Sequence, residues 1–312
     1  MGKVVGPGSL IVDMAAYAPH LPIGGETVMG SAFKLGPGGK GSNQMTAASR
    51  AGADVRLIGA VGTDALSSIL TDHYRNEGMS TKYIKVSETS ATGVALIEID
   101  EATAQNRIII VAGASDEVDD EDVRKAEEDF RDCDAVLCQF ETGLSSILEA
   151  KRMAKLYQKP FILNPAPYMP VPDEIFDGVD YLTPNETEAE FFTGVHIETL
   201  EDARAAAEIL LKKGVKRAIL TLGKKGSYYF DGTTELHLPC LPLKAVDTTG
   251  AGDAFSGGLA AAIADGYDDE TALKFATCTS NISVTRKGSS PAMPHRHEIL
   301  DLMKSEYGIV LN

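Results

Sequence analysis

The chain has 312 residues, of which 44% are apolar and 24% are charged, proportions typical of a globular protein with a sizeable core. Its formal net charge of −16 argues against nucleic acid and anionic membrane as partners, and an anionic substrate would need locally placed cations or a metal. No apolar run reaches the length of a membrane span, and the first residues lack a hydrophobic signal core. The cysteines form no CxxC pair, so we expect reduced thiols and a cytoplasmic protein without membrane association.

The first half of the chain alternates short apolar strands with helices. Strands are predicted at 4–5, 10–14 and 55–61, a small β element within 18–35, and helices at 43–50 and 66–77. The glycine-rich run before Ser42 lacks the glycine spacing of a P-loop, and Lys40 is followed by glycine instead of Ser or Thr. Its glycines are therefore interpreted as points where the backbone approaches a ligand. The alternation itself predicts a parallel sheet with crossover helices.

Two β segments interrupt this alternation. The apolar segments 93–99 and 107–111 are joined by a turn at 100–105. With the early β element they are expected to form a small β lid, built from about 10–40 and 85–112. An exposed apolar lid face favours a homodimer in which two lids pack together. That face is expected to carry Val94, Leu96, Ile108 and Ile110.

The second half of the chain continues the alternating pattern. Further strands are predicted at 134–140, 161–164, 179–183 and 217–222, a hairpin at 227–230 and 235–238, and helices at 254–263 and 272–284. The acidic residues from Asp116 to Asp129 are interpreted as the solvated face of a helix. We therefore expect one α/β domain over residues 1–312, a three-layer α/β/α sandwich with a mainly parallel central sheet, to which the β lid is attached.

The stretch 247–255, Asp-Thr-Thr-Gly-Ala-Gly-Asp-Ala-Phe, has the features of a catalytic device. A buried apolar helix follows it, so the N–H groups of Gly250, Ala251 and Gly252 are expected at a helix N-terminus, where unpaired donors and the helix dipole bind a phosphate or an oxyanion. Asp253 adds a carboxylate beside this anion hole. Such a pair suits transfer of a phosphoryl group from ATP to a hydroxyl; the alternative is a glycine-rich loop in which Asp253 only caps the helix.

Three motifs together resemble those of a known family. The stretch 247–255 resembles the C-terminal signature of the ribokinase family, the PfkB-type carbohydrate kinases, and the run 38–44 (Gly-Gly-Lys-Gly-Ser-Asn-Gln) resembles its N-terminal signature. Between them, 183–190 (Thr-Pro-Asn-Glu-Thr-Glu-Ala-Glu) is similar to the family's nucleotide and magnesium segment. The resemblance covers nearly the whole chain. It implies transfer of the γ-phosphoryl group of ATP to the primary hydroxyl of a sugar.

The resemblance also implies roles for individual residues. Asp253 would accept the hydroxyl proton, and the backbone of Gly250, Ala251 and Gly252 would hold the transferring phosphoryl group. Sugar binding is assigned to Asp13, Gly39, Lys40, Asn43, Glu141 and Asp253, and nucleotide binding to Asn185, Thr221, Gly223, Gly226, Thr277 and Asn281. Glu188 is expected to organise a hydrated Mg²⁺. An activating K⁺ beside the anion hole would be held at positions matching Asp247, Thr249, Ser283, Arg286, Gly288 and Ala292, the last of which lacks the hydroxyl often present in relatives.

The acceptor sugar is where the chain departs from the family. Ribokinases carry Gly-Ser-x-Asn-x-Asp, and in the matching run 8–13 Ile11 replaces the Asn. A sugar hydroxyl facing Ile11 would be unpaired at a cost of about 1–3 kcal/mol, which weakens the preference for ribose by roughly 10- to 100-fold. D-Ribose, giving ribose 5-phosphate, remains the first candidate because the other sugar-binding positions match. The alternatives are 2-deoxyribose, another sugar or a nucleoside; the intact motifs disfavour a catalytically silent sugar-binding regulator.

Overall fold

The computed structural model describes residues 1–103 and 105–311 and contains two β-sheets. Short runs of Val, Ile and Leu, buried on both faces, form the strands of the larger sheet. This main sheet has nine strands in the order β13-β12-β11-β10-β9-β8-β1-β4-β5. From β5 to β11 neighbouring strands are parallel, and β12 is antiparallel to both β11 and β13. The strands are β1 (Lys3–Pro7), β4 (Asp54–Val61), β5 (Ile84–Val86), β8 (Ala135–Gln139), β9 (Phe161–Asn164), β10 (Tyr181–Leu182), β11 (Ala218–Thr221), β12 (Ser227–Phe230) and β13 (Glu235–Leu238).

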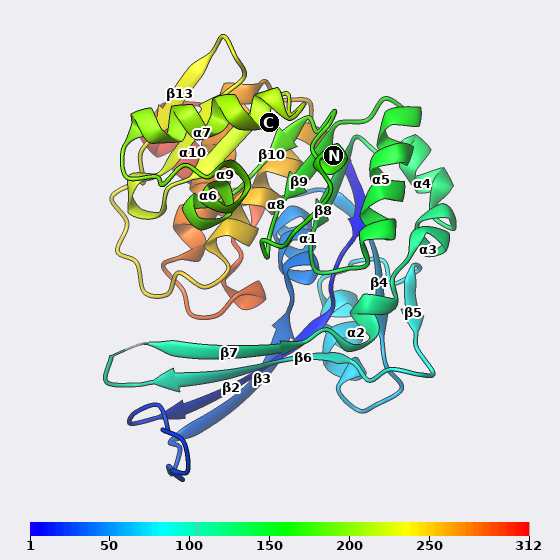
Figure 1. Ribbon diagram of the computed structural model, residues 1–312, viewed down its shortest axis with the longest axis vertical. Coiled ribbons are helices and arrows are strands. Elements are labelled where there is room, and N and C mark those ends of the chain that lie inside the picture. Colours follow the sequence, from blue (N-terminus) through cyan, green and yellow to red (C-terminus); the bar gives the residue numbers. More distant parts are fainter. Residues whose placement is uncertain (104, 312) are drawn as a thin grey trace.

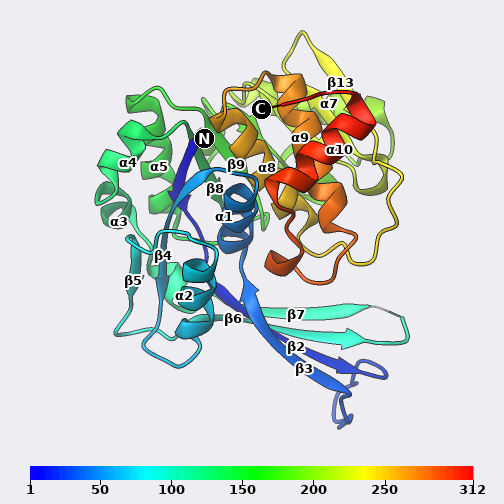
Figure 2. The same ribbon diagram turned by 180° about the vertical axis from the view of Figure 1, so that it is seen from behind.

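Helices cover both faces of the main sheet (Figure 1, Figure 2). One layer contains α1 (Lys40–Arg50), α2 (Ser67–Asn76), α8 (Ala251–Ala264), α9 (Asp269–Ser283) and α10 (Arg296–Tyr307). The other contains α3 (Asp120–Arg124), α4 (Glu127–Asp132), α5 (Leu144–Leu156), α6 (Glu186–Thr193) and α7 (Leu200–Lys212). Short 3₁₀ turns occur at Gly113–Glu117, Asp173–Ile175, Gly223–Lys225 and Ser290–Ala292. Because side chains alternate along a strand, Val4 and Val5 of β1 enter the two opposite cores. The predicted three-layer α/β/α sandwich is confirmed.

A four-stranded small sheet extends away from the sandwich, below it in both views (Figure 1, Figure 2). Its order is β3-β2-β6-β7, and β2 and β6 are parallel whereas the outer pairs are antiparallel. It consists of β2 (Ile11–Ala18), β3 (Ala32–Gly38), β6 (Gly93–Asp100) and β7 (Asn106–Val111). The predicted segments therefore do come together in one sheet, although Ala104 in their turn lies outside the described residues.

The register of the small sheet corrects one prediction. Leu96 lies opposite Ile109, and Ile97 lies opposite Ile108, so Leu96 and Ile108 are on different faces. The expectation of one apolar face holding Val94, Leu96, Ile108 and Ile110 is therefore wrong, and both faces are apolar. Residues 108–111 form a continuous apolar run, and such a run carries no alternation from which its register could be read.

Two element boundaries also differ from prediction. Helix α1 begins at Lys40, because Gly39 adopts a φ of 88° that ends the preceding strand, so Lys40 is a helix residue and not a loop lysine. The early β element is confined to β3, and residues 19–31 connect it to β2 without a strand. Strand β6 begins at Gly93, as predicted.

The acidic segment is less solvated than predicted. Asp122 and Asp129 are buried, and three short helices replace the single helix expected there. Asp129 accepts hydrogen bonds from Lys3 Nζ at 3.2 Å and Tyr83 Oη at 2.7 Å, and Asp122 pairs with Lys85. The correction has a simple cause: the partners come from β1, β5 and the residue before β5, far away in sequence.

Within the described ranges, no helix is both long and apolar enough to cross a membrane. All four cysteines are free thiols. Cys133, Cys138 and Cys278 are buried, whereas Cys240 is exposed. Burial raises the pKa of the Cys133 thiol to about 12, so it is a protonated, unreactive group at neutral pH.

Candidate active site

The site lies where the parallel strands of the main sheet end, the usual binding edge of such sheets. A cavity of about 270 Å³ and another of about 150 Å³ share lining residues from Asn185 to Gly252. A third cavity, of about 300 Å³, lies between the small sheet and the loops around Asp247 and Ser289. We refer to them as the outer, middle and lid-side cavities.

The start of α8 forms one wall of the middle cavity. Gly250 is its N-cap residue with a φ of 75°, and none of the described side chains caps the helix. Gly250, Ala251 and Gly252 all line this cavity, although the Ala251 N–H also donates to Thr248 O at 3.2 Å. An N-terminus of this kind attracts phosphate oxygens.

Asp253 does not cap α8 but turns toward α1. Its Oδ2 accepts from Asn43 Nδ2 at 3.0 Å, and its Oδ1 accepts from Gln44 Nε2 at 2.9 Å. The two helices can approach this closely because of Gly257, where a Cβ atom would lie 2.3 Å from Gln44 O. Asp253 is thus a buried carboxylate held by two amides beside the helix end.

Lys40 brings positive charge to the same cavity. Burial opposes its charge, but Asp253, Glu141 and Glu188 together raise the pKa of Lys40 above its ordinary value. Its backbone N–H donates to Glu141 Oε2 at 2.8 Å, and Ser9 Oγ donates to the same oxygen at 2.5 Å. Burial raises the pKa of Glu141, while Lys40 acts in the opposite direction. The ammonium group therefore remains available to balance phosphate charge.

Asp13 approaches from the small sheet and lines the lid-side cavity. Burial raises its pKa to about 6, against the hydrogen bond that Ser289 Oγ donates at 3.2 Å. Ile11 lies two residues earlier on β2 and so points to the same face. It is 3% exposed, and its side chain lies against Gly39 and Gly93. Ile11 is thus placed beside the predicted sugar-binding residues.

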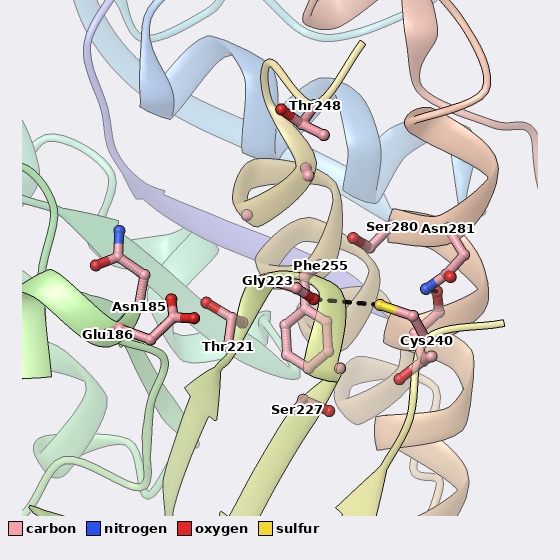
Figure 3. A pocket seen from close by; sticks show the side chains of 14 residues that line it. Asn185, Glu186, Thr221, Gly223, Ser227, Cys240, Thr248, Phe255, Ser280 and Asn281 are labelled. Carbon is pink, nitrogen blue, oxygen red and sulfur yellow. Dashed lines mark hydrogen bonds between the residues drawn. The ribbon is translucent and has the colours of Figure 1, made fainter. Parts of the chain in front are cut away.

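All six residues predicted to bind the nucleotide line the outer cavity (Figure 3). They are Asn185, Thr221, Gly223, Gly226, Thr277 and Asn281. Asn281 Oδ1 accepts from Leu241 N at 2.9 Å and so fixes the segment that borders the cavity. Sequence reasoning missed further lining residues, among them Ser227, Cys240 and Phe255 (Figure 3). No motif marks Cys240, which is brought there only by the chain path after β13.

Glu188 lines the middle cavity and forms a capping box with Asn185 at the start of α6. One carboxylate oxygen accepts from Asn185 N at 2.8 Å and the other from Asn185 Nδ2 at 2.9 Å. Burial raises the pKa of Glu188, and a bound cation would offset that effect. The remaining lone pairs of a carboxylate fixed in this way fit the water shell of a hydrated Mg²⁺.

Some of the positions assigned to K⁺ come together. The Asp247 carboxylate accepts from the N–H groups of Thr249 at 3.0 Å and Gly288 at 2.9 Å. These bonds hold the pKa of Asp247 below its ordinary value, although burial acts the other way. The side chains of Ser283 and Arg286 are engaged elsewhere, with Ser280 O and Glu298 respectively, so these two residues could contribute only backbone oxygens. Among the residues described, there is no cluster of three or more His, Cys, Asp or Glu side chains suited to a metal.

The fold is a parallel α/β sandwich in which a buried carboxylate and a lysine lie beside a helix N-terminus. This arrangement is the one expected of an enzyme that transfers a phosphoryl group. The family model of the pfkB family carbohydrate kinases matches residues 1–296. The chain is 34% identical over 297 residues to the ribokinase of Haemophilus influenzae, covering 95% of this chain and 97% of that one. It is 36% identical over 288 residues to the deoxyribokinase of Salmonella typhi, covering 92% and 94%.

Among solved structures, the ribokinase of Arabidopsis thaliana complexed with ribose and ATP is similar with a TM-score of 0.89 at 32% identity, covering 97% of this chain and 99% of that one. The chain belongs to the pfkB family of carbohydrate kinases. It is therefore a phosphotransferase that acts on a sugar hydroxyl.

Proposed function

We propose that the protein is an ATP-dependent pentose kinase that converts D-ribose into ribose 5-phosphate. The observation that carries this proposal is the position of Asp253, held by two amides between the nucleotide-side cavities and the cluster of Asp13, Asn43 and Glu141. The similarity to ribokinases over nearly the full length supports ribose and ATP as the substrates.

The proposed reaction follows from this placement. Asp253 takes the proton of the primary hydroxyl while the sugar oxygen bonds to the γ-phosphorus, and the bond to the bridging oxygen breaks to release ADP. The N–H groups at the start of α8 hold the equatorial phosphoryl oxygens, and Lys40 balances their charge. Asp13, Gly39, Asn43 and Glu141 would orient the sugar.

Magnesium would be held through the Asn185–Glu188 pair. This pair fits a hydrated ion because a fixed carboxylate and an amide face the same cavity as the helix end. When bound with ATP, Mg²⁺ supplies positive charge to the phosphates. The chain itself contributes the orientation of the carboxylate, which Asn185 fixes at both oxygens.

Activation by K⁺ is proposed on the grouping of Asp247, Thr249 and Gly288 next to the first residues of α8. We expect several-fold higher kcat in potassium chloride than in sodium chloride or a large organic cation at equal ionic strength. Asp247→Ala should remove this difference because it removes the only charged ligand proposed. Equal rates in all three salts for the native protein would contradict the site.

A second acceptor, 2-deoxyribose, is favoured by one observation. Ile11 lies on the sugar side of β2 and offers no hydrogen bond, so a sugar without a hydroxyl at that point loses nothing there. The similarity to a deoxyribokinase at 36% identity is consistent with this candidate.

The remaining proposals concern the whole chain. Residues 1–312 would work as one kinase unit, with the small sheet as a lid over the sugar and as the contact between two subunits. Exposed apolar side chains on one face of this sheet support the contact: Ile109 is 64% exposed, and Leu96 opposite it is 44% exposed. Three buried, unpaired thiols support a reducing compartment such as the cytoplasm.

The proposal is tested by ADP release with a panel of pentoses, 2-deoxyribose, hexoses and nucleosides, each at matched concentrations with Mg²⁺ and K⁺. We expect the largest kcat/KM with D-ribose or 2-deoxyribose, and a 5-phosphate as the product by ³¹P NMR. A larger kcat/KM for a hexose or nucleoside would contradict the pentose assignment, and absence of sugar-dependent ADP release would contradict the kinase activity.

A further inference from the structure

We propose that Gln44 and Gln139 are positioning residues, parts of a chain of buried amides that aims the carboxylate of Asp253 at the acceptor hydroxyl. The inference rests on the proposed function of Asp253 and concerns residues to which neither the motifs nor the comparisons assign a role. The amide chain consists of Gln139 at the end of β8, Gln44 on α1 and Asn164 at the end of β9.

The amide chain is continuous. Gln139 Nε2 donates to Gln44 Oε1 at 2.7 Å. Gln44 Nε2 then donates to both Asp253 Oδ1 and Asn164 Oδ1, each at 2.9 Å. Asn164 Nδ2 donates to Thr183 O at 2.7 Å. The side chains are buried, with Gln44 0% and Gln139 1% exposed, so water does not compete for these bonds.

The direction of the amide chain is forced by its two ends. The Asp253 carboxylate and the Thr183 carbonyl oxygen can only accept hydrogen bonds. Gln44 must therefore present its NH₂ group to Asp253 and its oxygen to Gln139. If Gln44 turned over, its oxygen would face the carboxylate, and like partial charges would meet in a buried site. Gln139 holds Gln44 in the productive orientation without touching Asp253 itself.

This arrangement leaves one buried atom unpaired. Gln139 Oε1 has no hydrogen-bond partner among residues 1–103 and 105–311. Apolar residues of similar shape at both 44 and 139 would avoid that cost, so stability alone does not call for this pair of glutamines. The cost is understandable if the NH₂ group of Gln139 is needed for its effect on Gln44.

A matching bond fixes the other carboxylate oxygen. Ser290 Oγ donates to Asn43 Oδ1 at 2.7 Å, which leaves the Asn43 NH₂ group to donate to Asp253 Oδ2. Asp253 is therefore held at both carboxylate oxygens. Gln139 of β8 acts on one oxygen through Gln44, and Ser290 in the turn before α10 acts on the other through Asn43. Fixing both oxygens restricts rotation of the carboxylate, and such orientation is a recognised source of rate enhancement.

The test is Gln139→Met, which keeps the length of the side chain and removes both polar groups. We expect kcat to fall between about 10- and 100-fold with the KM values for sugar and ATP changed less than about twofold. The melting temperature should change little, because the unpaired oxygen of Gln139 is removed while Gln44 Oε1 loses its donor. Loss of rate without loss of stability is an outcome that a merely structural role would not produce. Should Gln139→Met fail to fold, Gln44→Met tests the same link.

Two controls sharpen the result. Cys138→Ala changes the neighbouring residue of β8, buried in the opposite core, and should lower stability with little effect on kcat. In an Asp253→Asn background, Gln139→Met should change the residual kcat by less than about twofold, because it acts through that carboxylate. An undiminished kcat in Gln139→Met, or an equal loss in both backgrounds, would overturn the inference.

A direct readout separates the inference from the proposed function. In crystals of the ligand-free Gln139→Met variant, the Asp253 carboxylate should occupy more than one rotamer or a rotated one, and an unchanged single rotamer would overturn the inference. This measurement needs no acceptor. A native enzyme that phosphorylates no sugar would therefore contradict the proposed function alone, and the crystallographic result would still decide the role of the amide chain.

Discussion

The catalytic floor, formed by Asn43, Gln44, Asn164 and Asp253, and the small sheet are built in opposite ways. In the floor each residue is no more than 6% exposed, and its polar groups are connected by hydrogen bonds between 2.7 and 3.0 Å long. In the small sheet, residues 108–111 of β7 are between 48% and 64% exposed although all are Ile or Val.

The two regions obtain their order from different sources. The polar groups of the floor have partners within one chain, on α1, α8, β8 and β9 and at Thr183 and Ser290. The small sheet satisfies its backbone groups through strand pairing but leaves its apolar side chains in water, so it needs something else to cover them. We therefore expect changes in the floor to act on chemistry, and changes in the small sheet to act on substrate choice and assembly.

The strongest test of the floor is Asp253→Asn, which keeps the shape and removes the charge. A positioned base contributes typically about 10²–10⁴-fold, so kcat should fall by at least that range. Circular dichroism and the melting temperature should show an intact fold. Turnover close to that of the native protein would show that another group takes the proton.

The junction of floor and small sheet is tested by Ile11→Asn. The new amide can pair with a sugar hydroxyl, so the ratio of kcat/KM for ribose to that for 2-deoxyribose should rise by roughly 10- to 100-fold. Ile11→Val is the matched control, because it keeps the position apolar and should leave the ratio nearly unchanged. A ratio that does not move in Ile11→Asn would mean that residue 11 does not face the sugar.

The variant Asp13→Asn measures how much the buried Asp13 carboxylate lowers the free energy of unfolding. The pKa of Asp13 is raised from 3.8 to about 6, so the native state favours the protonated carboxyl group. The contribution of this protonated group to the free energy of unfolding is fully present below pH 3.8 and is lost as the pH rises through 6. At pH 7.5, Asp13→Asn should therefore raise the free energy of unfolding by up to about 3 kcal/mol while weakening sugar binding.

Urea unfolding of Asp13→Asn and the native protein at pH 4 and pH 7.5 measures this effect. The difference between the two proteins should be small at the lower pH and largest at the higher one. A destabilised variant at pH 7.5 would show that burial of the carboxylate is fully compensated by its neighbours.

A matched pair in the small sheet tests assembly and not turnover, since Ile108 also lines the lid-side cavity. Ile108 and Ile109 are adjacent in β7 but point to opposite faces. If two sheets pack face to face, only one of Ile108→Glu and Ile109→Glu should convert a dimer into a monomer, and it identifies the contact face. Sedimentation at micromolar concentration measures this. A native protein that is already a monomer would refute the dimer.

Much of the fold could be predicted from the sequence because several elements have strong local sequence patterns. Gly78, which follows the predicted helix 66–77, and Gly250 mark element boundaries through positive φ, and the apolar runs of β4, β8 and β9 end close to where they were expected. The hairpin of β12 and β13 was also predicted correctly. Prediction failed at β7, because its apolar run has no periodicity. It also failed at Asp122 and Asp129, because lysines from distant parts of the chain pair with these residues of a local acidic run.

Local patterns in the sequence are enough to predict the helix that begins beside Gly250, six of the residues that line the outer cavity, and the family, because short-range backbone geometry is encoded locally. The groups that surround Asp253, and the direction of their hydrogen bonds, depend on the tertiary structure. Gln139 is 95 residues from Gln44, and Gln44 is 209 residues from Asp253. Contacts over such separations depend on helix packing and strand order, and no local pattern along the chain records them.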